Sequence, residues 1–243
     1  MAKLTMSYAP GVKLIELVSR NPELPAERFH YHWHAIHGEL GRLCSVQANG
    51  TINRYCQNHR INPTVDGLAP LDYDGVGEIW FDNEAAVEQL LQSPAYLEKL
   101  RPDEPGMADL SSTITLLCRE RELLDRGLLP VGTAKITVSI SRRAGLDDAE
   151  FEARFAAHGE KFRDQPGLIQ YTQSRVDAAK AYVHPDGSSP GGQIDAIELI
   201  AWPDLLKLES AWGSVGQVYL AGIAEFADVN RCAAVITDHR RIF

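Results

Sequence analysis

The sequence predicts an α+β fold in which two copies of a βαββαβ module, fused in tandem, form one pseudo-dimeric α/β barrel. The first observation behind this prediction is an internal repeat, because the same landmarks recur in the same order in both halves of the 243 residues. The second is the pattern inside each half. Short β-rich runs alternate there with amphipathic helices in the order strand, helix, strand, strand, helix, strand.

The repeat begins at the first strand of each half and continues to the last. Chance rarely produces so many matches in one order, so we interpret the chain as a duplication. The matched pairs are Val12-Lys13-Leu14-Ile15 with Ala134-Lys135-Ile136-Thr137; Phe29…Trp33…His37-Gly38-Glu39 with Phe151…Phe155…His158-Gly159-Glu160, with one residue of slippage; Tyr55-Cys56-Gln57 with Tyr171-Thr172-Gln173; Gly75–Trp80 with Asp195–Ile200; and Met107-Ala108-Asp109 with Phe226-Ala227-Asp228.

The individual elements follow from residue patterns. Ile136, Val138 and Ile140 alternate with small polar residues, as in a strand. Pro25 suits the first turn of a helix that continues towards Cys44 with a buried stripe. The remaining expected elements are strands at Val12–Val18, Ala134–Ser141, Thr113–Cys118 and Cys232–Thr237, a helix that starts near Asp147, and shorter helices at Glu84–Gln92 and Leu205–Ala211.

This order of elements is the ferredoxin-like split βαβ motif, whose antiparallel sheet carries helices on one face and leaves the other face uncovered. Two such sheets packed face to face close a barrel, and here one chain supplies both. We expect one module at residues 1–120 and a second, diverged one at 133–243. Arg119–Gly132 reads as the connector, and Asp177–Gln193 as a long surface loop.

Composition excludes several classes of protein. A net charge of −9 argues against a nucleic-acid partner, which requires a concentrated basic surface. No apolar run is long enough for a membrane span, and Met1–Gly11 has no secretory core. The four cysteines show no C-x-x-C spacing, which favours reduced thiols. We therefore expect a cytoplasmic protein without membrane or nucleic-acid partners, and a homodimer stays open.

Histidines are concentrated on the first long helix. At regular helical spacing His30, His34 and His37 share a stripe that borders the groove between helix and sheet, whereas His32 points away. Imidazole is the usual acid/base group near neutral pH. His37 recurs as His158 beside Gly-Glu, which makes both candidate site residues.

A metal site is the alternative interpretation, since His30 and His34 have i, i+4 ligand spacing and His37 or His59 could converge on them. No glutamate or aspartate completes an H-E-x-x-H pattern, so we favour a site with no metal and no cofactor. The sequence also contains no phosphate-binding or nucleotide-binding glycine motif.

Other polar residues on the predicted strands are candidates as well. Tyr55 and its counterpart Tyr171 could orient a substrate carbonyl or simply be buried phenols. Glu78 aligns with Glu198 in mid-strand, where a carboxylate is costly unless it is paired. We favour a structural ion pair of Glu78 with Arg54 or Lys13 over an acid/base role.

A set of short motifs in the first half has the pattern of a known family. These motifs are Phe29-x-x-x-Trp33-x-x-x-His37, Tyr55-x-Gln-Asn, Tyr73-Asp74-Gly75-Val76-Gly77-Glu78-Ile79-Trp80-Phe81-Asp82, Ser93-Pro94-Ala95-Tyr96, Asp103-Glu104 and Met107-Ala108-Asp109. By them the first half resembles the EthD domain of the dimeric α/β-barrel superfamily over about Val12 to Leu117. The second half resembles a diverged copy, in which Phe155 replaces Trp33, Ile200 replaces Trp80 and the Asp-Gly step is altered.

The resemblance implies binding of a flat ring between helices and sheet, with His37 on the family histidine as general acid/base. We expect a cofactor-independent lyase, a decarboxylase in the first instance, for an aromatic or polyketide-like acid. In it His34, Tyr55 and Asp74 would assist His37, and His30, Trp33, Trp80, Phe81, His158 and Tyr171 would bind the substrate. The alternatives are a cyclase, dehydratase or isomerase, a monooxygenase on the same fold, and a non-catalytic accessory protein of an aromatic or ether degradation pathway.

Overall fold

The computed structural model describes residues 7–61, 64–177 and 194–243. Of the surface loop expected at Asp177–Gln193, all but Asp177 lies outside these residues. The first half contains β1 (Val12–Val18), α1 (Ala26–Tyr31), the π-helix η1 (His32–His37), α2 (Gly38–Gln47), β2 (Arg54–Arg60), β3 (Ala69–Pro70), β4 (Gly75–Phe81), α3 (Glu84–Leu91), the π-helix η2 (Tyr96–Leu100), α4 (Arg101–Met107) and β5 (Ile114–Asp125). The second contains β6 (Ala134–Ile140), α5 (Asp148–Phe162), β7 (Gln170–Val176), β8 (Ala196–Trp202), α6 (Leu205–Ile223), the 3₁₀ turn η4 (Val229–Arg231) and β9 (Ala233–Arg241).

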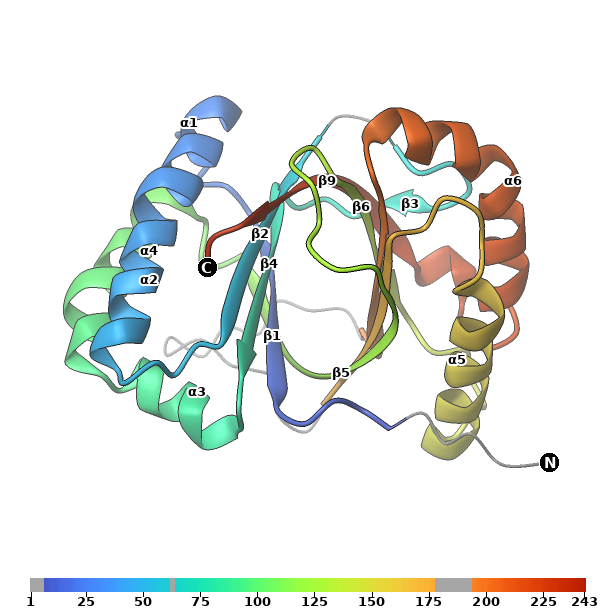
Figure 1. Cartoon of the computed structure of the whole chain (residues 1–243), viewed down its shortest axis with the longest axis horizontal. Helices are drawn as coiled ribbons and strands as arrows, with labels where there is room; N and C mark the ends of the chain where they lie inside the picture. Colours follow the sequence, from blue (N-terminus) through green and yellow to red (C-terminus); the bar gives the residue numbers. More distant parts are fainter. Residues whose placement is uncertain (1–6, 62–63, 178–193) are drawn as a thin grey trace.

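The strands form one closed antiparallel barrel, which confirms the predicted fold class. Their order is β2-β4-β1-β5-β7-β8-β6-β9, and β9 pairs again with β2 to close an eight-stranded barrel; the two-residue β3 adds to β9 in parallel. The two sets of four strands are thus joined edge to edge by the long last strand of each half. One chain closes the barrel without a second copy (Figure 1).

Helices cover the outside of the barrel on two opposite sides (Figure 1). The helices of the first half lie against β2, β4, β1 and β5, and α5 and α6 lie against the strands of the second half. Asn83, Asp147 and Asp204 cap α3, α5 and α6, since each side chain accepts a hydrogen bond from a backbone N–H of the first turn. No helix in the described part of the chain is long and apolar enough to cross a membrane.

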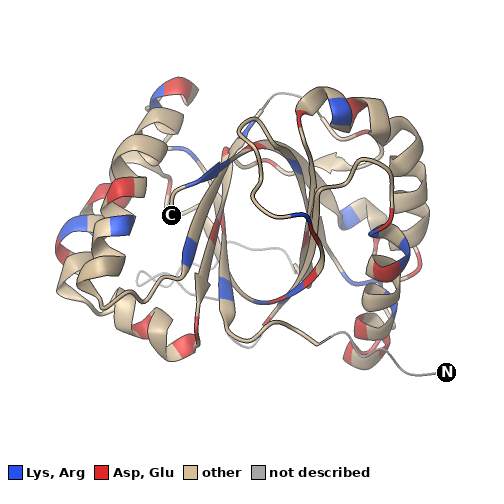
Figure 2. Ribbon diagram, in the orientation of Figure 1, with Lys and Arg blue, Asp and Glu red and all other residues tan. Residues whose placement is uncertain are grey.

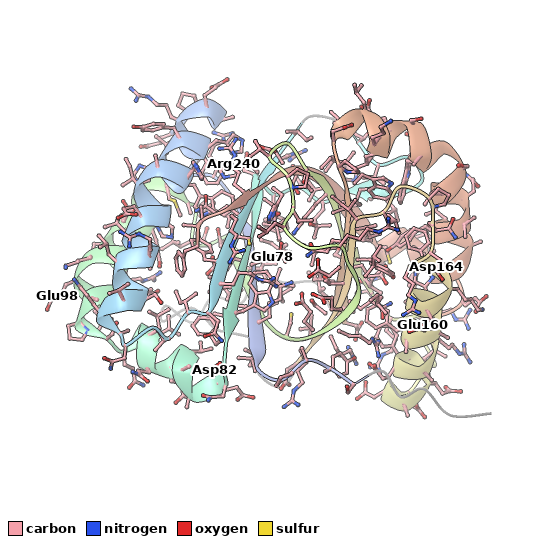
Figure 3. The ribbon with its side chains drawn as sticks, in the orientation of Figure 1. Glu78, Asp82, Glu98, Glu160, Asp164 and Arg240 are labelled. Carbon is pink, nitrogen blue, oxygen red and sulfur yellow. The ribbon has the colours of Figure 1, made fainter. Side chains whose placement is uncertain are left out.

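The barrel interior is apolar at one end and charged at the other. Ile15 and Leu17 of β1 point into the apolar end, and Lys13, two residues earlier on the same face, points into the charged end. Lys13 Nζ lies 2.7 Å from Glu78 Oε2, and Lys135 Nζ lies 2.9 Å from Glu78 Oε1. The expected structural ion pair between Glu78 and Lys13 is therefore present, and Figure 3 shows Glu78 in the middle of the barrel.

The alignment of Glu78 with Glu198 is wrong by one residue. Glu16 pairs with Gly77 in the first half, and Val138, which matches Glu16 by position in the repeat, pairs with Glu198 in the second. Glu198 therefore matches Gly77. Because a shift of one residue reverses the face of a strand, Glu78 points into the barrel and Glu198 points towards the helices. By the same register Trp80 matches Ala201 and not Ile200.

The π-helix η1 accounts for the one-residue slippage in the repeat. Gln57 and Gln173 occupy matching positions and donate to the backbone carbonyls of Trp33 and Phe155, respectively. Gly38 follows Trp33 by five positions, whereas its counterpart Gly159 follows Phe155 by four. A π-turn accommodates one additional residue inside a helix, and such turns are frequent at functional sites.

Candidate active site

A cleft of about 290 Å³ lies between the outer face of β1 and β5 and the helices of the first half. Its walls are mainly apolar, and a smaller recess of about 60 Å³ continues it towards β2 and β4. The polar side chains in its lining are Glu16, His37, Gln92, Tyr96, Arg101, Glu104, Thr113 and Thr115. Apolar walls with a few convergent polar groups are typical of small-molecule sites.

His37 is fixed in this cleft by a hydrogen bond to Asp103. Its Nδ1 lies 3.0 Å from Asp103 Oδ2, and His32 Nε2 lies 2.7 Å from the other carboxylate oxygen. The π-helix brings His32 and His37, five residues apart, to the same carboxylate, which corrects the expectation that His32 points away. Since Nδ1 is engaged, Nε2 is the ring nitrogen left to meet a ligand.

Glu16 is a second ionisable group in the cleft. It stands in the middle of β1 opposite Gly77, where a Cβ would lie 3.1 Å from Glu16 Oε2. Burial and, to a lesser extent, nearby Glu104 raise the pKa of Glu16 to about 7, against the opposing effect of His37. A carboxyl with this pKa exchanges a proton near neutrality.

Glu104 is held at the helix side of the cleft by two partners. Tyr96 Oη donates to Glu104 Oε1 at 3.0 Å, and the Arg101 guanidinium pairs with the other oxygen. Burial, with Glu104 adding to it, raises the pKa of Tyr96. The cleft therefore contains an oriented imidazole, a protonatable carboxyl and a neutral phenol, which are groups suited to proton transfer.

The structure brings three of the sequence-predicted residues to this cleft. His37 lines both parts of it, and Tyr55 and Phe81 line the inner recess. Tyr55 Oη accepts a hydrogen bond of 2.9 Å from Gln57 Nε2. Burial raises the pKa of Tyr55, so the phenol stays neutral.

Three other predicted residues lie on α1 and η1 but outside the cleft. Nδ1 of His30 is 3.0 Å from Nδ1 of His59, and the rings of His34 and His59 are 5.9 Å apart. Burial lowers the pKa of His59 to about 2, so its imidazole is neutral. Trp33 is fully buried with its ring edge against Gly75. Within the described residues no group of three His, Cys, Asp or Glu side chains is arranged to hold a metal ion.

Asp74 and Trp80 are also remote from the cleft. Asp74 accepts a hydrogen bond of 2.9 Å from the backbone N–H of Arg20, and Asp195 does the same for Arg142 in the second half. Trp80 points into the charged end of the barrel, where its Nε1 donates to Glu120 Oε1 at 2.8 Å. Asp74 thus holds the backbone at Arg20, and Trp80 is part of the packing inside the barrel.

The corresponding space in the second half is filled by aromatic side chains. Tyr171 donates to Glu198 Oε1 at 2.6 Å, and Tyr219 donates to the other carboxylate oxygen. The ring of His158 packs 5.2 Å from that of Tyr219, and its Nε2 lies 3.8 Å from Glu198. A cavity of about 230 Å³ borders His158, but α5, α6 and Glu225 line it and no strand does.

Sequence reasoning did not select Glu16, Asp103, Tyr96 or Glu104 as site residues. A signal for Glu16 was present, because a carboxylate interrupts the apolar run Leu14–Val18 at a position that faces the helices. Tyr96, Asp103 and Glu104 occur in the motifs of the family resemblance. Their convergence depends on η1 and η2, and the one-residue slippage in the repeat was the sole sign of η1 in the sequence.

Comparison with known proteins finds one family model that matches part of the first half, and solved structures that share the fold. The EthD domain model matches residues 21–111. A candidate monooxygenase of Fusobacterium nucleatum has a similar structure, with a TM-score of 0.61, 9% identity and coverage of 97% of this chain and 95% of that one. An anthrone oxidase-like protein is similar with a TM-score of 0.58 and 8% identity, and the match covers 96% of this chain and 94% of that one. A chlorite dismutase mutant from Candidatus Nitrospira defluvii is similar with a TM-score of 0.54 and 12% identity, and the match covers 100% of this chain and 96% of that one. No curated protein sequence matches significantly.

Proposed function

We propose that the protein is a lyase that transfers protons to and from a flat aromatic or polyketide-like substrate in the cleft, a proposal that the match of residues 21–111 to the EthD domain model supports. The supporting observation is His37, which Asp103 fixes through Nδ1 in the lining of an apolar cavity. An oriented imidazole beside a bound ligand is the usual arrangement for general acid/base catalysis. Proton transfer of this kind requires no cofactor.

Decarboxylation of a hydroxylated aromatic acid is the reaction we propose first. Protonated His37 gives its proton to the ring carbon that bears the carboxylate. The bond to the carboxylate carbon then breaks, its electron pair restores the aromatic ring, and carbon dioxide leaves. Water returns a proton to His37.

Glu16 supports this chemistry through its own proton. With a pKa of about 7 it is partly protonated at neutral pH and donates a hydrogen bond to a phenol or carbonyl oxygen. This bond stabilises the keto form of the ring that arises when carbon is protonated. Leu14, Leu91 and Met107 supply apolar walls for the ring, and Arg101 is a cation in the lining that could face the carboxylate.

Dehydration, cyclisation or isomerisation of an uncharged keto substrate is the second candidate. Two carboxyl groups, Glu16 and Glu104, line the cleft, and the Arg101 guanidinium is already paired with Glu104. A negatively charged substrate would meet more repulsion there than an uncharged one. In this reaction His37 removes a proton from carbon while Glu16 donates one to the leaving or carbonyl oxygen.

Incubation with two matched sets of compounds tests the proposal. One set contains hydroxyanthraquinone and hydroxynaphthoic carboxylic acids, and the other contains uncharged polyketide-like ketones of similar size. Mass spectrometry distinguishes loss of carbon dioxide, loss of water, and rearrangement without a change in mass. An oxygen electrode detects monooxygenase chemistry, which would contradict a lyase. Saturable binding of these compounds without turnover would favour an accessory protein.

A further inference from the structure

A second cavity, of about 310 Å³, opens at the charged end of the barrel. It lies within the ring of strands, whereas the His37 cleft lies outside that ring under the helices. Gly127, Leu128 and Leu129 of the connector between β5 and β6 are part of its lining. Strands of both halves line it, so it exists only because the barrel is closed. Figure 2 shows basic and acidic residues together on these strands.

The buried carboxylate of this cavity is already fully bonded. Glu78 Oε1 accepts hydrogen bonds from Asn58 Nδ2 at 2.8 Å and from Lys135 Nζ at 2.9 Å. Its other oxygen faces Lys13 at 2.7 Å. At the rim, Asp125 Oδ1 accepts from the backbone N–H of Gly127 at 2.8 Å. The carboxylate oxygens in the lining therefore already accept hydrogen bonds from the protein itself.

The donors in the lining are less committed. Thr172 is 3% exposed, and among the described residues its Oγ1 has no hydrogen-bond partner. The Arg54 guanidinium stacks 3.6 Å from the ring centre of Trp80 and lies 3.8 Å from Glu120 Oε1, which is too far for a hydrogen bond. Arg241 is exposed at the rim. A buried hydroxyl without a partner is costly, so a ligand atom that accepts from Thr172 is favoured.

The charges of the cavity lining also favour a ligand that accepts hydrogen bonds. Three cationic side chains line the cavity, Arg54, Lys135 and Arg241, against the two carboxylates of Glu78 and Asp125. This positive balance occurs in a chain with a net charge of −9. His239 contributes no charge, because burial lowers its pKa to about 3. Its Nδ1 donates to Asn58 Oδ1 at 2.9 Å, which leaves Nε2 as an acceptor.

We propose that the charged end of the barrel binds a small oxyanion, the carboxylate or phosphate group of a metabolite, through Arg54, Arg241 and Thr172. Arginine guanidinium groups match the geometry of both anions, and stacking on Trp80 leaves the edges of Arg54 available for hydrogen bonds. A hydroxyl group next to the anion would donate to His239 Nε2. The cavity volume suits a small metabolite and excludes a protein segment.

Isothermal titration calorimetry of the full chain at constant ionic strength tests this site. The probes are inorganic phosphate and malonate, with chloride as the reference. We expect saturable binding of at least one probe, and the tighter probe identifies the anion. Arg241→Gln should weaken it about tenfold or more, which is the cost of one hydrogen bond to a charged group. Thr172→Val should weaken it severalfold.

Two control variants make the result specific. Arg28→Gln removes the same charge from the exposed face of α1 and should leave the affinity unchanged. His37→Ala should also leave it unchanged, so the outcome does not depend on the function proposed for the cleft. The proposal is overturned if neither probe binds saturably, if Arg28→Gln and Arg241→Gln weaken binding equally, or if His37→Ala abolishes it.

Discussion

Gly77 and Glu198 occupy the same position in the two halves of the barrel. Gly77 pairs with Glu16 across β4 and β1, and Glu198 pairs with Val138 across β8 and β6. Each half therefore places one carboxylate on the strand face that looks towards the helices, but from a different strand. The missing side chain at Gly77 leaves room for Glu16, whose oxygen would lie 3.1 Å from an added Cβ.

The surroundings of the two carboxylates differ as much as their positions. Glu16 borders an open cleft, whereas Glu198 is completely buried and bonded to Tyr171, Tyr219 and Gln173. A carboxylate with three donors around it is a structural centre, and it leaves little capacity for a ligand. The first half thus has a cleft bordered by a carboxyl group, whereas the carboxylate of the second half lies in a packed aromatic core.

Replacing Gly75 by alanine should destabilise the first half through Trp33. A Cβ at Gly75 would lie 2.2 Å from the Trp33 ring, which is fully buried and cannot move away freely. We expect the free energy of unfolding in urea to fall by about 1–3 kcal/mol, the usual cost of overpacking. Gly106→Ala is the matched control, since its added Cβ meets nothing within 4 Å. An equal loss in both variants would contradict this explanation.

Replacing Glu78 by glutamine should remove the anion shared by Lys13 and Lys135. Both lysines are buried and both contact Glu78, so the change leaves uncompensated positive charge inside the barrel. We expect a loss of about 3–5 kcal/mol in the free energy of unfolding. Glu98→Gln makes the same chemical change on an exposed helix face (Figure 3) and should change stability by less than about 0.5 kcal/mol. A small effect at Glu78 would mean that Glu120 alone neutralises the lysines.

Local pattern was enough to predict the barrel, because the repeat and the strand alternation are encoded in short runs of sequence. The alignment of Lys13 with Lys135 was correct, because both occupy the same position in the first strand of their half. The register of β8 was not predictable in the same way, since Glu78 and Glu198 look alike in an alignment while pairing alone fixes which face each one takes.

The candidate site was predictable in part, for a related reason. His37 was selected because it recurs beside Gly-Glu, and it does line the cleft. Its neighbours come from distant segments: Asp103 from α4, Glu16 from β1. The regular 3.6-residue period predicts that His32 and His37 face different sides of the helix. The π-turn η1 changes the rotation between them, so both face Asp103. Such a turn reflects tertiary packing, which residue periodicity does not report.

Glu16 should make the stability of the protein depend on pH. Its pKa is about 7 in the folded chain and near the ordinary 4.5 of a glutamate in the unfolded chain, so between these values the folded state binds more protons. Stability therefore falls as pH rises through this window and levels off above it. Relative to wild type, Glu16→Gln should gain about 1–3 kcal/mol between pH 5 and pH 8. Urea denaturation at both pH values measures this, and a difference independent of pH would contradict a raised pKa.

Replacing His37 by alanine should lower turnover about 10²–10⁴-fold with the compound that the screen identifies, the usual range for a lost general acid or base. The fold should persist, because His37 borders a cavity and does not fill a core. Asp103→Asn should have a smaller effect in the same direction, since asparagine keeps the shape but holds the imidazole less firmly.

His158→Ala is the matched control for His37, because it removes the same residue from the equivalent helix of the second half. In that half Glu198 is bonded to tyrosine and glutamine side chains, so it is not available to a ligand in the way that Glu16 is. Turnover by the folded His158→Ala variant should therefore stay close to that of the wild type, although its stability falls. If both variants lost turnover equally at equal folded fraction, the second half would share in catalysis. If His37→Ala retained full turnover, the cleft would need another acid/base group, and Glu16→Gln would show whether that group is Glu16.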